Sequence, residues 1–113
     1  MTITADLSDR TAIVTGASSG IGRAIAERLG AAGAHVILSG RTAAAMEESA
    51  GRIGDAGGRA SVVVGDVRTS GAVDDLVATA MDADGHLDIL VNNAGISFLG
   101  GVLDGDTEQW QSM

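Results

Sequence analysis

The sequence predicts an α/β fold in which a doubly wound parallel sheet carries helices on both faces. Short, β-branched apolar segments alternate with amphipathic segments of roughly 10–15 residues, a pattern typical of strand–helix–strand units. The apolar segments are apolar almost throughout, as expected of strands buried on both faces. Right-handed crossovers between such strands give the local strand order 3-2-1-4.

The first strand–helix unit contains a glycine-rich turn. A buried strand is predicted over 11–14, and the turn Thr15–Gly22 follows it directly. Gly16 permits a tight bend, while Gly20 and Gly22 leave room for a pyrophosphate and the neighbouring strand. The helix after the turn has apolar residues at helical spacing: Ile21, Ala24, Ile25, Leu29 and Ala32. Its amino terminus favours a phosphate charge. The spacing is G-x-x-x-G-x-G rather than the commoner G-x-G-x-x-G.

The second unit follows with little intervening chain. Gly33 is predicted to cap the first helix, and the second strand covers 35–39. Thr42 is predicted to cap a second helix. The apolar face of that helix consists of Met46, Ala50 and Ile53.

A third unit completes the pattern. The third strand is predicted over 60–64, and Thr69 or Ser70 is expected to cap a third helix. The residues expected to be buried on this helix are Val73, Leu76, Val77, Ala80 and Met81. The fourth strand, over 87–91, runs into Asn92-Asn93-Ala94-Gly95. A last helix is expected to begin at Asp106 or Thr107 and to continue to the end of the chain.

Composition excludes several classes of function. The net charge is −8 and the basic residues are seven scattered arginines, which argues against a nucleic-acid partner. No apolar segment approaches the roughly 20 residues of a membrane span. Residues 1–6 lack the basic and apolar regions of a secretory signal, so we expect a cytoplasmic protein.

These motifs, in this order, resemble the amino-terminal half of a short-chain dehydrogenase/reductase. The resemblance rests on Thr15–Gly22, on Asp66-Val67 and on Asn92-Asn93-Ala94-Gly95, and it extends from about Leu7 to Met113. It implies a Rossmann-type fold and one dinucleotide-binding domain over residues 1–113. The asparagine–glycine motif argues against a flavodoxin-type protein, which would share the doubly wound fold.

The resemblance also implies roles for individual residues. In the family, the glycine turn holds the pyrophosphate and a residue after the second strand contacts the adenosine ribose. The Asp-Val pair contacts adenine, and the last motif lines the ribose and steadies the sheet. The residues implied here as cofactor-binding are Gly16, Ser18, Ser19, Gly20, Ile21, Gly22, Arg41, Asp66, Val67, Asn93, Ala94 and Gly95.

Arg41 favours NADP over NAD as the cofactor. Enzymes that use NAD place a carboxylate near this position to accept hydrogen bonds from the ribose 2′-hydroxyl. Here Gly40 stands where that acid is expected, and the arginine beside it suits a phosphate. NAD remains the less favoured alternative, because Ser19 occupies the loop position where many NADP-using relatives carry a second basic residue.

No metal site is predicted. His35 and His86 are expected to be surface or turn residues. The aspartates near His86 do not form a recognisable ligand set, and the acidic residues around Asp106 lack the glycine of a calcium loop, since Gln109 takes its place.

The residues that would complete the chemistry are absent. In the family a tyrosine transfers the substrate proton and a lysine lowers its pKa, but this sequence contains neither residue. No catalytic residue is therefore assigned, and the chain alone is expected to be inactive. We expect the front half of a longer enzyme, which would act on a small carbonyl or alcohol substrate and form a homo-oligomer. The alternative is a free-standing or vestigial nucleotide-binding module.

Overall fold

The computed structural model describes residues 6–18 and 20–93. In this part of the chain four strands alternate with three helices. In chain order they are β1 (Thr11–Thr15), α1 (Gly20–Ala31), β2 (His35–Gly40), α2 (Ala43–Asp55), β3 (Arg59–Val64), α3 (Ala72–Asp84) and β4 (Ile89–Asn92). The final helix expected from Asp106 or Thr107 lies outside the described residues.

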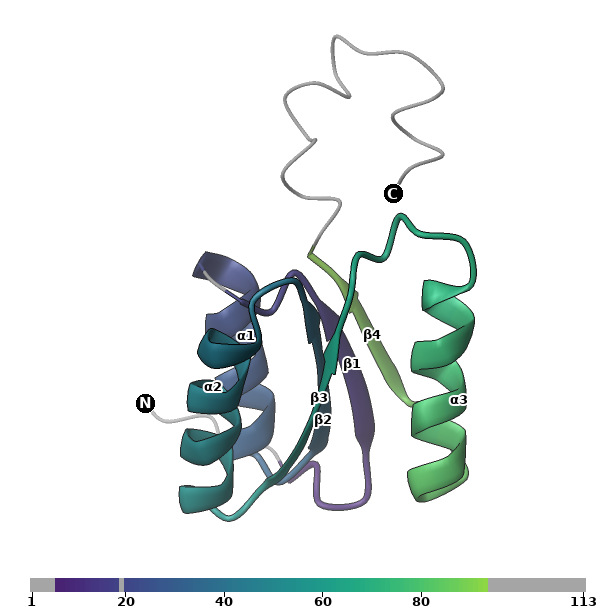
Figure 1. The fold of residues 1–113 in the computed structure, drawn as a ribbon. Helices are drawn as coiled ribbons and strands as arrows, with labels where there is room; N and C mark the ends of the chain where they lie inside the picture. Colours follow the sequence, from purple (N-terminus) through teal and green to yellow (C-terminus); the bar gives the residue numbers. More distant parts are fainter. Residues whose placement is uncertain (1–5, 19, 94–113) are drawn as a thin grey trace, which may run out of the picture.

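The strands form one parallel sheet in the order β3-β2-β1-β4, which confirms the predicted topology. Thr11 pairs with His35, and Ala12 pairs with Ile89. Helices α1 and α2 lie on one face of the sheet and α3 on the other (Figure 1). This arrangement follows from right-handed crossovers, because the chain reverses its direction across the sheet between β3 and β4.

Alternating residues of the central strands build two separate cores. Val14, Val36 and Leu38 pack toward α1 and α2, where they meet Met46 and Ile53. The intervening residues of the same strands face α3. This second cluster consists of Ile13, Ile37, Leu76 and Ala80. Because both faces of β1 and β2 are covered, every residue of β1 and nearly all of β2 are buried, as predicted for these strands.

Two of the three predicted helix caps agree with the structure. Gly33 follows α1 at a φ of 101° and donates its N–H to the carbonyl of Gly30, as expected of a glycine cap. Thr42 occupies the amino-terminal cap of α2, although its side chain makes no capping hydrogen bond. The predicted caps of α3 were wrong, because Gly71, with a φ of 85°, precedes the first turn instead of Thr69 or Ser70. Asp74 and Asp75 in that turn complement the helix dipole.

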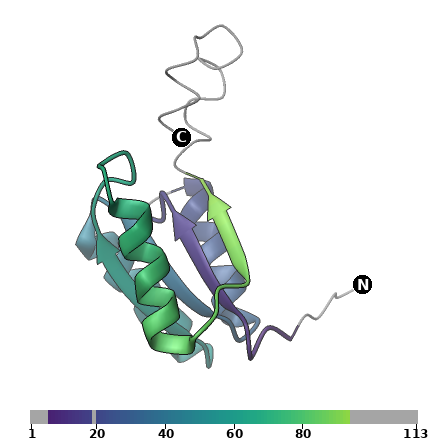
Figure 2. The same ribbon diagram turned by 90° about the vertical axis from the view of Figure 1, so that its right-hand side faces the viewer.

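The prediction for the buried face of α3 was right for two of its five residues. Leu76 and Ala80 are buried, whereas Val73, Val77 and Met81 are 50%, 37% and 48% exposed. The view in Figure 2 looks onto this side of the sheet, with α3 in front of the strands and β4 beside it. One helix covers this face among the described residues, so only the side of α3 turned to the sheet is buried.

Within the described part of the chain, no helix is both long enough and apolar enough to cross a membrane.

Candidate functional site

The turn between β1 and α1 requires glycine at several positions. Gly16 and Gly20 have φ values of 62° and 59°, in the left-handed region that favours glycine. A Cβ on Gly22 would lie 2.1 Å from the carbonyl oxygen of Gly16, so this position tolerates no side chain. A Cβ on Gly20 would meet nothing within 4 Å, so the start of α1 is open on this side. The turn is therefore closely packed at Gly22 and open beside Gly20.

Asn93 connects this turn to the end of β4, the strand next to β1. Its side-chain Nδ2 donates to the carbonyl of Gly16 at 3.1 Å. The position is determined by the register of β4, in which Asn92 pairs with Thr15 at the end of β1. A residue 77 positions away in the sequence thus fixes the conformation of the glycine turn.

The end of β2 lies against the same turn. A Cβ on Gly40 would approach the Ser18 hydroxyl to 2.4 Å, so a larger residue at this position would require the Ser18 side chain to move. The Ser18 hydroxyl accepts a hydrogen bond from the backbone N–H of Thr42 at 3.2 Å. Arg41, which lies between Gly40 and Thr42 in the sequence, is exposed.

The end of β3 carries Asp66 and Val67 at the edge of a cavity of about 200 Å³. Arg68 binds the Asp66 carboxylate in two places, with Nε 3.1 Å from Oδ1 and Nη2 2.9 Å from Oδ2. These hydrogen bonds lower the pKa of Asp66 to about 2, and the charge of Arg41 adds to the effect. Sequence reasoning did not single out Arg68; its position after the Asp-Val pair was the available signal.

The structure therefore brings together the predicted site residues that it describes. The glycine turn, Arg41, the Asp66-Val67 pair and Asn93 all follow the carboxyl ends of parallel strands, which meet at one edge of the sheet. Ile21, in the first turn of α1, is 60% exposed at this edge. Ser19, Ala94 and Gly95 lie outside the described residues.

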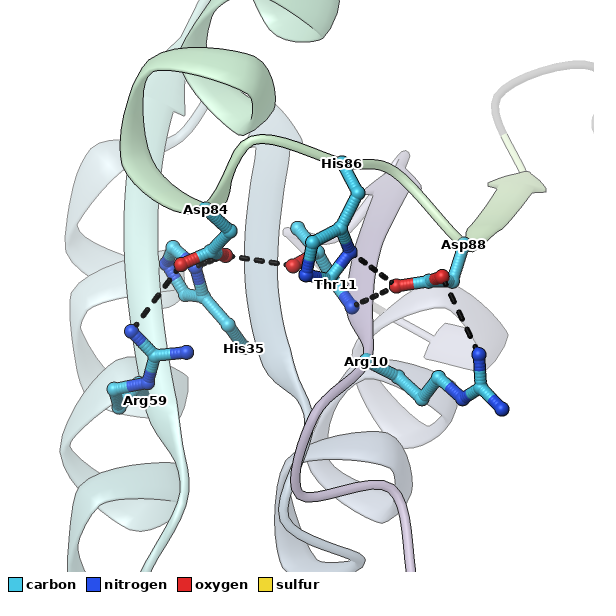
Figure 3. Close-up of polar contacts among 7 residues, drawn as sticks. All are labelled: Arg10, Thr11, His35, Arg59, Asp84, His86 and Asp88. Carbon is cyan, nitrogen blue, oxygen red and sulfur yellow. Dashed lines mark hydrogen bonds and ion pairs between the residues drawn. The ribbon is translucent and has the colours of Figure 1, made fainter.

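A second polar cluster lies at the opposite, amino-terminal edge (Figure 3). His35 is 5% exposed, so the prediction that it is a surface or turn residue was wrong. Its Nδ1 lies 2.5 Å from Asp84 Oδ2 and its Nε2 lies 2.8 Å from the Ser61 hydroxyl. Burial beneath the end of α3 explains the difference, because the side chain has polar partners on α3 and on β3.

Asp84 is the centre of this cluster. It accepts a hydrogen bond from the Thr11 hydroxyl at 2.6 Å, and one of its oxygens lies 3.3 Å from Arg59 Nη1. The Thr11 and His35 hydrogen bonds lower the pKa of Asp84 to about 2. The order serine–histidine–aspartate is that of a nucleophilic triad. However, Asp84 connects α3 to β1, β2 and β3. We therefore interpret the cluster as structural: it fixes the end of α3 on the sheet.

Asp88 makes a similar connection beside it. It accepts a hydrogen bond from the backbone N–H of Thr11 at 2.8 Å and lies 2.7 Å from His86 Nδ1. The Thr11 hydrogen bond is the main cause of a lowered pKa for Asp88. His86 is exposed, as predicted. Across residues 6–18 and 20–93, no group of three or more histidine, aspartate or glutamate side chains is arranged to hold a metal ion.

Comparison with known proteins identifies the family to which the chain belongs. The family model described as short chain dehydrogenase matches residues 10–113. An uncharacterized oxidoreductase of Staphylococcus epidermidis is 40% identical over 109 residues, which are 96% of this chain and 46% of that relative. A fatty acyl-CoA reductase of Acinetobacter baylyi is 45% identical over 81% of this chain and 31% of its own length.

Among solved structures, L-sorbose reductase from Gluconobacter frateurii, complexed with NADPH and L-sorbose, superimposes with a TM-score of 0.77 at 37% identity. The match covers 97% of this chain and 42% of that enzyme. The chain thus spans less than half the length of the relatives it matches. The glycine turn, the strand order and the family match together establish that this chain belongs to the short-chain dehydrogenase family of oxidoreductases.

Proposed function

We propose that this chain is the NADP(H)-binding half of a short-chain dehydrogenase. Its 113 residues would form one dinucleotide-binding domain of a larger enzyme that transfers a hydride between NADP(H) and a carbonyl or alcohol substrate. The observation that carries the proposal is the convergence at the carboxyl edge of an open glycine turn, Arg41, Asp66 and Asn93. The substrate and any oligomeric assembly belong to the complete protein.

The geometry of the turn fits a dinucleotide. Gly22 allows α1 to start in contact with Gly16, and the space beside Gly20 is open for a pyrophosphate. The amides at the start of α1 would donate hydrogen bonds to its oxygens. The nicotinamide ring of a bound cofactor would supply or accept the hydride. The role of the chain described here is to bind and orient that cofactor.

Three observations favour NADP over NAD. Gly40 puts no carboxylate at the end of β2, and a larger residue there would have to displace the Ser18 hydroxyl. Arg41 follows Gly40 and is exposed, so its guanidinium group is accessible to a 2′-phosphate. The structural relative from Gluconobacter frateurii was solved with NADPH.

The dehydrogenase half is favoured over a free-standing nucleotide-binding module. The family match covers residues 10–113. The two relatives found by sequence, from Staphylococcus epidermidis and Acinetobacter baylyi, are both named as redox enzymes.

Titration of NADP⁺ and NAD⁺ by calorimetry tests the cofactor preference. We expect tighter binding of NADP⁺, and we expect Arg41→Ala to remove most of the difference. The loss of one charge-assisted contact corresponds to about 1.5–3 kcal/mol, or roughly tenfold to over a hundredfold. Arg28→Ala is the control, because Arg28 lies in the last turn of α1 at the other edge of the sheet. Equal affinities for NADP⁺ and NAD⁺ in the unsubstituted protein would contradict the proposal.

A further inference from the structure

Arg68 lies at the proposed adenosine end of the site, and nothing in the sequence pattern assigns it a role. Its backbone N–H and its guanidinium group all contact Asp66, so both carboxylate oxygens have a partner. The side chains of Asp66 and Arg68 are 31% and 46% exposed. Exposed ion pairs contribute little to stability, so the main consequence of this pair is on the local charge.

The pair lies beside the residue expected to bind the 2′-phosphate. The backbone N–H of Gly65 donates to the carbonyl of Gly40 at 2.8 Å, which joins the end of β3 to the end of β2. Gly40 also pairs with Val64 in the sheet register. The residue after Gly40 is Arg41, and the residue after Gly65 is Asp66. The chain thus places a carboxylate next to the arginine that would receive the phosphate.

An ionised carboxylate at this position opposes phosphate binding. The low pKa of Asp66 keeps it charged at every physiological pH. The glycine turn adds no cation on its own side, because Ser18 and Ser19 are uncharged. At about 0.15 M salt, charges repel over about 8 Å, so the charge of Asp66 would reach a phosphate bound at Arg41 unless it is neutralised.

We propose that Arg68 is a positioning residue that holds and neutralises Asp66, so that a ribose 2′-phosphate can bind against Arg41. This role rests on the proposed NADP site. Arg68 would set the preference for the 2′-phosphorylated nucleotide through Asp66, without itself touching the phosphate.

The experiment compares two probes that differ only in the 2′-phosphate: adenosine 2′,5′-bisphosphate and adenosine 5′-monophosphate. The ratio of their dissociation constants is measured by calorimetry in the full chain at low and at about 0.15 M salt. We expect Arg68→Gln to weaken the bisphosphate about threefold to tenfold relative to the monophosphate. The effect should shrink as salt increases. Arg28→Gln, which removes the same charge at the other edge, should leave the ratio unchanged.

Two further variants separate neutralisation from direct contact. Arg68→Lys, which keeps the charge, should retain most of the ratio. Asp66→Asn should restore the ratio in the Arg68→Gln background, because the charge to be neutralised is gone. Failure of this rescue would overturn the neutralising role. An Arg68→Gln ratio equal to that of the unsubstituted protein would overturn it as well.

The outcome also separates this inference from the function on which it rests. If Arg41→Ala lowers the ratio and Arg68→Gln does not, the NADP site stands and only the role of Arg68 is wrong. If Arg41→Ala leaves the ratio unchanged, or the unsubstituted chain binds neither probe, both proposals fail.

Discussion

Single atoms decide the conformation of the glycine turn. The Gly22 Cα hydrogen points at the Gly16 carbonyl, and the Asn93 amide lies close to the same point. Pattern analysis predicts that glycine is needed here, and the structure gives the reason. The Gly16 carbonyl and the side chain of Asn93, the residue after β4, occupy the space that a Cβ would take. The contrast with Gly51, where a Cβ would meet nothing within 4 Å, shows that glycine positions in this chain differ widely in what they tolerate.

The Gly22→Ala substitution should damage the turn. We expect a loss of about 1–3 kcal/mol in the free energy of unfolding, since the new methyl group must displace backbone. Nucleotide binding should weaken at the same time. Urea titration followed by circular dichroism measures the first effect. The matched control is Gly51→Ala in α2, which should be neutral or stabilising by up to about 1 kcal/mol. Equal stability of the Gly22→Ala variant and the unsubstituted protein would contradict the geometry of the turn.

Asp84 should make the stability of the protein depend on acid pH. Its pKa is about 2 in the folded protein and 3.8 as the ordinary value. A lowered pKa stabilises the fold above the unfolded pKa, and this contribution disappears as the pH falls from about 4 to about 2. Asp84→Asn should therefore lower the free energy of unfolding by about 1–2 kcal/mol at pH 7.

Denaturant titrations of the Asp84→Asn variant at several pH values check this expectation. The difference in the free energy of unfolding between the variant and the unsubstituted protein should become smaller below pH 4. Asp82→Asn, at an exposed position of the same helix, should show no such difference. A difference in the free energy of unfolding that stays constant down to pH 2 would show that the contacts of Asp84 do not stabilise the fold through its charge.

At the scale of elements, α3 differs most from its prediction. Helical spacing placed five apolar residues on one face, but the sheet covers only part of that face. Val73, Val77 and Met81 recur at every fourth position and remain exposed, and Leu90 on β4 is 59% exposed. The alternation of β4 turns Leu90 toward the same face of the sheet as its partner Ile13, which packs toward α3. Val73, Val77 and Met81 therefore form an apolar stripe along α3, and Leu90 is a further exposed apolar residue on the edge strand of the described sheet.

This apolar stripe should promote association of the 113-residue chain. We expect association to increase with salt, because the net charge of −8 keeps copies apart only over about 8 Å at 0.15 M salt. Val77→Glu should reduce it severalfold. Sedimentation and light scattering across a salt series measure the effect. Ala44→Glu, which adds the same charge at an exposed position of α2, is the control. A monomer at all salt concentrations would rule out this role for the stripe.

At the scale of the whole molecule, the residues proposed for cofactor binding are present, whereas the residues that the family uses for proton transfer are absent from this sequence. The chain has the residues proposed to orient a dinucleotide, but its sequence contains neither tyrosine nor lysine. We expect the 113-residue chain to show no reduction of carbonyl compounds above background, measured as NADPH consumption with a panel of ketones. Free tyrosine has a pKa near 10, so it needs a neighbouring cation, which in the family is a lysine, to act near neutral pH. This sequence contains neither the tyrosine nor the lysine. Turnover that is lost on Gly20→Val substitution would show that the chain is catalytic by itself.

The sequence alone determined the topology and most of the carboxyl edge. The periodicity of the strands and helices is a local property, and right-handed crossovers convert it into the order β3-β2-β1-β4. The positions of Gly16, Arg41, Asp66 and Asn93 follow, because parallel strands bring their carboxyl ends to one edge. Their roles in binding stay predictions.

Only the tertiary structure decided which side chains meet. The burial of His35 depends on Asp84, which is 49 residues away in the sequence. The exposure of Val77 depends on which elements lie beside α3. The pairing of Arg68 with Asp66 has a local cause, but its proximity to Arg41 requires the β2–β3 register. Periodicity in a sequence specifies which way a side chain points along its own element, whereas contacts between elements depend on register and on the neighbours that cover each face.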